Sequence, residues 1–149
     1  MTLVERVSTP IVSGWQMKKA SSVSGGGVQL TTQLFPTDGI KATVPGTVLT
    51  TLVDQKKVDD PYFDLNNTIK QDISTVTPAH YTYWFYTKFD IAKKTPADRQ
   101  WLSLRGINYT ASVYLNGHLV SQDCDGVAGN DFLQGMFRRF MLDITDSAV

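Results

Sequence analysis

Hydrophobic and polar residues alternate most regularly between residues 101 and 120, as in strands with one buried face. Leu102 and Leu104 start this alternation, and it resumes after residue 110. Asn116 and Gly117 then interrupt it, and both residue types accept the positive φ angles of a type I′ turn. The pattern predicts a β-hairpin that turns at Asn116-Gly117.

The remaining patterns predict mostly strands and one short helix. Aromatic and β-branched residues favour strands over residues 14–18, 28–32, 81–90 and 138–143. The helix is expected to begin after Thr47, because a proline and a capping threonine precede apolar residues at helical spacing, and to end near Lys57. Turn-forming residues separate the other segments. This order is typical of an all-β antiparallel sandwich or jelly roll.

Length and charge narrow the classes of function. A chain of 149 residues with 42% hydrophobic content can bury one core, so one domain over residues 1–149 is predicted. Fourteen basic residues balance fourteen acidic ones, which argues against nucleic acid or an anionic membrane as a partner.

Cys124 is the only cysteine, which excludes an internal disulfide. No segment is apolar enough for a signal peptide or a membrane span, so the chain as written is expected to be soluble and cytoplasmic, its compartment otherwise undetermined.

The segment VDDPYFDLNN, residues 58–67, concentrates oxygen-bearing side chains and suggests a calcium loop. Counted from Asp60, however, the sixth position is not glycine, and the twelfth is Gln71 where an EF-hand has glutamate. We therefore predict no metal. No cofactor is predicted either, because the glycines at 25–27 are not followed by the lysine and threonine of a phosphate-binding loop.

Aromatic side chains offer a second kind of candidate site. Trp84, Tyr86 and Trp101 are candidates for stacking on sugar rings, because pyranose C–H faces pack against aromatic faces. The alternative is that these rings pack in the core, which is the commoner role of aromatic residues in strands.

Six segments occur in a fixed order along nearly the whole chain: residues 13–15, 44–53, 60–67, 83–89, 107–118 and 135–146. Together they resemble the N-terminal sugar-binding-like domain of glycoside hydrolase family 2, most closely the branch of plant mannosylglycoprotein endo-β-mannosidases and exo-β-glucosaminidases. Thr87 and Lys88 stand where an arginine often follows the aromatic run, unlike the galactosidase and glucuronidase branches.

The resemblance implies a jelly-roll, galactose-binding-like β-sandwich with one short helix, here lacking its final strand. In such enzymes an immunoglobulin-like domain and a barrel with two catalytic glutamates follow. Retaining hydrolysis needs two carboxylates about 5 Å apart, whereas Glu5 is the only glutamate of this chain. We therefore expect an inactive fragment: the non-catalytic accessory domain of an enzyme acting on β-mannosidic or β-glucosaminidic bonds, with an open edge that favours self-association. The alternatives are a free-standing carbohydrate-binding module and a purely structural scaffold.

The resemblance also suggests a role for the polar segment. In the resembling enzymes the loop after the short helix lies towards the barrel, which implies that Asp60, Tyr62 and Asn66 contact substrate hydroxyls. No catalytic residue is assigned to this chain. In the structural alternative, Asp60-Pro61 forms a rigid turn, Tyr62 and Phe63 anchor it to the core, and Asn66 caps it.

Overall fold

The computed structural model describes residues 7–33, 35–64, 81–91, 95, 98–122 and 129–148. The chain forms two compact units, one of Met1–Ala20 and Ile40–Phe89, the other of Ser21–Gly39 and Asp90–Val149. Each unit is described by itself.

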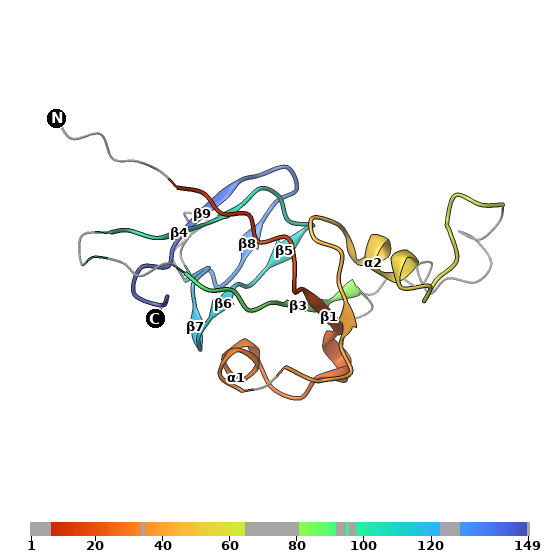
Figure 1. The fold of residues 1–149 in the computed structure, drawn as a ribbon, viewed down its shortest axis with the longest axis horizontal. Helices are drawn as coiled ribbons and strands as arrows, with labels where there is room; N and C mark the ends of the chain where they lie inside the picture. The colour runs from red at the N-terminus through yellow and green to blue at the C-terminus, as the bar shows by residue number, and fades with distance from the viewer. Residues whose placement is uncertain are drawn as a thin grey trace. The chain divides into compact units, whose positions relative to one another are not determined.

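The first unit contains a three-stranded antiparallel sheet in the order β2 (Ile40–Lys41), β1 (Gln16–Lys19) and β3 (Tyr83–Tyr86). Figure 1 shows β1 and β3 side by side. Met17 pairs with Ile40 on one side and Phe85 on the other, and its side chain is fully buried. Strands were predicted over residues 14–18 and 81–90, and both are confirmed; β1 begins two residues later and ends one residue later than predicted, and β3 is shorter than predicted.

The predicted helix is α2 (Val48–Asp54), and its start is confirmed. The Thr47 hydroxyl accepts a hydrogen bond from the Thr50 backbone N–H at 3.1 Å, which satisfies one of the unpaired donors of the first turn. The helix ends three residues before the predicted Lys57 because Lys56 adopts a left-handed φ of 54°. Its neighbour Lys57 then donates to the Leu52 carbonyl at 2.8 Å, as in a Schellman motif.

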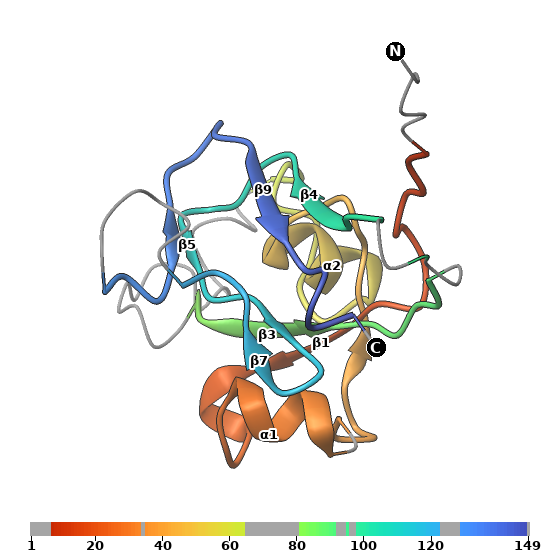
Figure 2. The ribbon, with the colours of Figure 1, turned by 90° about the vertical axis from the view of Figure 1, so that its left-hand side faces the viewer.

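In the second unit, residues 28–32 were predicted to form a strand, and this prediction was wrong. They belong to α1 (Gly27–Thr32), which follows a 3₁₀ turn at Ala20–Ser22. The Thr31 and Thr32 hydroxyls donate to the carbonyls of Gly27 and Val28, at 2.8 and 2.9 Å. The helix lies beside the β6–β7 hairpin (Figure 2). Tertiary contacts thus override the strand preference of these residues.

The strands of the second unit form three antiparallel pairs: β4 (Trp101–Leu104) with β9 (Phe140–Asp143), β5 (Thr110–Ala111) with β8 (Leu133–Gln134), and β6 (Tyr114–Leu115) with β7 (His118–Leu119). Asn116 and Gly117 join β6 to β7 with φ angles of 47° and 86°. Both angles are positive, as a type I′ turn requires, so the predicted hairpin is confirmed.

The core of the second unit follows the period-two pattern. Phe140 and Leu142 are buried, whereas Met141 and Asp143, which alternate with them along β9, face outward. Leu133 and Ile144 complete the buried cluster, against which Leu102 and Leu104 pack from β4. The described residues are therefore mostly strands with short helices, which confirms the predicted all-β class. None of the helices in the described ranges has the length and hydrophobicity that a membrane span requires.

Candidate functional site

The described part of the polar segment, residues 58–64, forms a fixed turn after α2. The Tyr62 backbone N–H donates to the Asp60 carboxylate at 2.9 Å, and the Phe63 N–H donates to the Asp60 carbonyl at 3.1 Å. An aspartate side chain that accepts a hydrogen bond from the backbone N–H two residues ahead mimics a β-turn. Pro61, which lies between Asp60 and Tyr62, has its φ angle fixed by its ring. The turn predicted for Asp60-Pro61 is therefore present.

This turn points its two rings into solvent. Tyr62 is 95% exposed and Phe63 is 71% exposed. The structural alternative, in which both rings anchor the turn to the core, is wrong on this point, because both rings are exposed. The N–H groups of Tyr62 and Phe63 hold the turn to Asp60 without help from the rings. Asn66 lies outside the described residues. The loop thus combines a carboxylate, a phenol and an apolar ring at the surface.

The predicted stacking residues lie in two different sheets. Trp84 and Tyr86 share one face of β3 in the first unit, and both are half-buried. Trp101 lies on β4 in the second unit and is 52% exposed. Trp101 is thus the most open of the three rings, and the sugar-stacking role of all three stays a prediction.

A carboxylate and a guanidinium lie next to Trp101. Asp143 is its cross-strand partner, and the Asp143 carboxylate forms an ion pair with Arg99 at 2.8 Å. Hydrogen bonds from Thr145, and then the contact with Arg99, hold the pKa of Asp143 below its ordinary value of 3.8. An exposed indole beside an ionised acceptor and a cationic donor suits a ligand with both an apolar face and hydroxyl groups.

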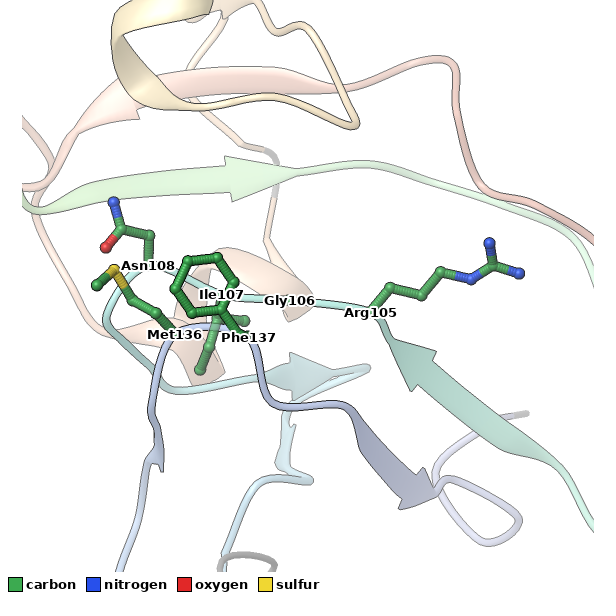
Figure 3. Close-up of a pocket in the computed structure, with 6 residues that line it drawn as sticks. All are labelled: Arg105, Gly106, Ile107, Asn108, Met136 and Phe137. Carbon is green, nitrogen blue, oxygen red and sulfur yellow. The ribbon is translucent and has the colours of Figure 1, made fainter.

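A pocket of about 370 Å³ that no sequence motif had predicted lies where β4 ends and β9 begins (Figure 3). Residues that follow β4 line one part of it, and residues that precede β9 line the other: Arg105, Gly106, Ile107, Asn108, Met136 and Phe137. The only signal in the sequence was the pair of large apolar residues Met136-Phe137 between a glycine and two arginines. The two walls are about 30 residues apart in the chain, so no local motif joins them.

Metal-ligating residues are not clustered in the described ranges, where no three His, Cys, Asp or Glu side chains are placed to hold an ion. His118 is exposed on β7. Cys124 and Gln71 lie outside the described residues.

Residues 15–148 match the family described as glycosyl hydrolase 2 galactose-binding domain-like, so the chain belongs to this family. A mannosylglycoprotein endo-beta-mannosidase from Lilium longiflorum is 41% identical over 139 residues. The alignment covers 90% of this chain but 13% of that relative. No solved structure matches the chain. The predicted family and its galactose-binding-like fold class are confirmed.

Proposed function

We propose that this chain is the non-catalytic accessory domain of a family 2 glycoside hydrolase that acts on β-mannosidic or β-glucosaminidic bonds. The observation that carries the proposal is the 41% identity to a mannosylglycoprotein endo-beta-mannosidase across 90% of the chain. Membership of the galactose-binding-domain-like family supports the same role. The partners in this proposal are a carbohydrate and the barrel and immunoglobulin-like domains of a parent enzyme.

The single glutamate of this chain supports a non-catalytic role. A retaining glycosidase uses two Asp or Glu carboxyl groups about 5–5.5 Å apart, one as acid and one as nucleophile. This chain has a single glutamate, Glu5, which lies outside the described residues. The ionised carboxylate of Asp143 is engaged by Thr145 and Arg99. The proposal therefore places the acid and the nucleophile in another domain.

The Asp60 loop is the proposed contact with substrate at the rim of that other domain's active site. Tyr62 supports this assignment, because its ring is 95% exposed and its backbone N–H is held by the Asp60 carboxylate in a hydrogen-bonded turn. A turn whose backbone is already ordered loses less conformational entropy on binding than a flexible loop does. Asp60 and Asn66 would supply hydrogen bonds to sugar hydroxyls beside it.

Enzyme assays on the purified chain test the proposal. We expect no hydrolysis of p-nitrophenyl β-mannoside, β-glucosaminide or β-galactoside, with a complete family 2 β-mannosidase as the positive control. Turnover by this chain that disappears when one of its own residues is mutated would contradict the accessory role.

A free-standing carbohydrate-binding module is the second candidate. It is favoured by the exposed Trp101 ring beside the Arg99–Asp143 ion pair. This candidate requires that the chain retain glycans on its own, whereas a pure scaffold would not. Affinity electrophoresis in gels containing β-mannan separates the two, because binding slows the chain and Trp101→Ala should abolish the delay.

A further inference from the structure

The pocket between residues 105–108 and 136–137 has the size and lining of a small-ligand site. Its volume of about 370 Å³ falls within the range of about 300–1,000 Å³ typical of such sites. Figure 3 shows the Phe137 ring in front of Ile107, with Met136 beside the Asn108 carboxamide and the Arg105 side chain extending away from them. Apolar side chains therefore supply most of the lining, and the Asn108 carboxamide supplies a polar group beside them.

Phe137 is held in an unfavourable conformation. Its φ is 61°, in the left-handed region that bulky residues rarely adopt, and its side chain is 95% exposed. Neither packing nor backbone preference explains a phenylalanine at this position. A strained residue that persists is a reason to look for a function at that residue.

The residues around Phe137 fix the turn that presents it. The Gly135 N–H donates to the Tyr109 carbonyl at 2.9 Å, and the Arg138 guanidinium donates to the Gln134 carbonyl at 2.8 Å. Arg138 also lies over the Phe140 ring, 5.0 Å from its centroid. The turn is therefore tied to the sheet on both sides, while the Phe137 ring itself remains open to solvent.

The lining indicates the class of ligand. A pyranose has an apolar C–H face that packs on an aromatic ring and hydroxyl groups that need planar donors and acceptors. Phe137, Met136 and Ile107 offer the apolar surface, and the Asn108 carboxamide offers both a donor and an acceptor. Phosphate would instead need several converging donors, and Arg105 is the only charged residue that lines the pocket.

We propose that this pocket binds one neutral pyranose ring of a β-linked carbohydrate, with Phe137 as the stacking surface and Asn108 as the hydrogen-bonding group. The site deepens the proposed function and rests on it for the choice of sugar. It adds a contact that is separate in sequence from the Asp60 loop.

Titration of the full ¹⁵N-labelled chain with β-1,4-mannobiose, followed by NMR, tests the site. We expect amide shifts at residues 106–108 and 135–138. Phe137→Asn should weaken binding at least tenfold, yet leave the melting temperature unchanged or higher, because asparagine tolerates a left-handed φ. Asn108→Ala should weaken binding several-fold. Met141→Ala is the matched control, because Met141 is similarly apolar and 55% exposed but does not line the pocket.

Two results would contradict the proposal that this pocket binds a pyranose. One is the absence of shifts at these residues at the highest soluble mannobiose concentration, and the other is full binding by Phe137→Asn. Binding that survives Phe137→Asn but is lost in Tyr62→Ala would reject the pocket and leave the accessory function intact. Hydrolysis of mannobiose by the chain would instead reject the accessory function, while the effect of Phe137→Asn on binding still reports on the pocket.

Discussion

Threonine hydroxyls determine local structure at several points of this chain. Thr47 caps α2, and the buried Thr51 hydroxyl accepts from the Thr43 N–H at 3.1 Å. Thr31 accepts from the Gly117 N–H at 2.9 Å and so ties α1 to the β6–β7 turn. Short polar side chains can replace backbone partners at helix ends and turns, where the main chain leaves donors unpaired.

Removing the cap of α2 should destabilise the chain. We expect Thr47→Ala to lower the free energy of unfolding by about 0.5–2 kcal/mol, because the Thr50 N–H loses its acceptor. Urea denaturation followed by circular dichroism measures this change. Thr47→Asp keeps an acceptor and should be close to wild type; equal losses in both variants would show that the hydroxyl is not acting as a cap.

Asp143 should make stability depend on pH in the acid range. Its pKa in the folded chain lies below 3.8, chiefly because of Thr145 and secondarily because of Arg99. The folded state thus favours the charged form. This stabilisation is present above pH 3.8 and is lost as the pH falls through the lower folded value.

The comparison of wild type with Asp143→Asn tests this dependence. The wild type should be the more stable at pH 7, and the difference should shrink below pH 3.8. Arg99→Gln should retain most of the dependence, because the Thr145 hydrogen bonds are the larger cause. A difference that is constant from pH 7 to pH 2, measured by chemical denaturation, would contradict the assignment.

At the scale of elements, α1 depends on contact with its neighbours. Gly27 is buried at the start of the helix, and a Cβ there would lie 2.2 Å from the Tyr114 ring on β6. The absence of a side chain therefore allows the helix to approach the hairpin closely. Val28, Thr31 and Thr32 are β-branched and would favour a strand in isolation.

A methyl group at Gly27 should separate α1 from β6. We expect Gly27→Ala to destabilise the chain by about 1–3 kcal/mol through overpacking. Gly26→Ala is the matched control, because no atom lies within 4 Å of a Cβ at that position. Thermal unfolding measures both variants. Similar losses in the two would indicate that glycine acts through the backbone and not through close packing.

At the scale of the whole molecule, exposed apolar surface is the feature to test. Trp101 and Met141 are 52% and 55% exposed on the same outer face of β4–β9, and within the described residues these strands pair only with each other. Open strand edges and apolar patches favour association. We expect the sedimentation coefficient of the purified chain to rise with concentration, and Met141→Lys to reduce that rise. A single monomeric species at every concentration would contradict this prediction.

The proposed contact between the Asp60 loop and substrate can be tested in a complete family 2 enzyme that contains this domain. Asn66→Ala should lower kcat/KM several-fold with little change in melting temperature, because loss of one hydrogen bond to substrate costs about 0.5–1.5 kcal/mol. Pro61→Ala should act mainly on stability, because it loosens the turn backbone. If Asn66→Ala keeps its kcat/KM while its melting temperature falls, the loop is structural and makes no contact with substrate.

Many features of this structure depend only on residues that are neighbours in the sequence, so they could be predicted from the sequence. The alternation along residues 101–104 and 140–143 determines which side chains face the core, and Asn116-Gly117 determines the hairpin, because both depend on neighbouring residues alone. The same holds for the start of α2 at Thr47. The order of short segments along the chain was also sufficient to identify the family, since it requires no knowledge of contacts.

Other features arise from contacts between distant residues, which only the tertiary structure decides. Residues 28–32 are helical because Gly27 meets Tyr114 and Thr31 meets Gly117, both more than 80 positions away. The Asp60 turn is local, but the 95% exposure of the Tyr62 ring is decided by the tertiary structure, because it depends on which other residues pack against the ring. The pocket exists because pairing of β4 with β9 brings residues 105–108, which follow β4, near residues 136–137, which precede β9. The local sequence pattern determines which face of an element is apolar. Only the tertiary structure determines which residues cover that face and which parts of it stay exposed to solvent.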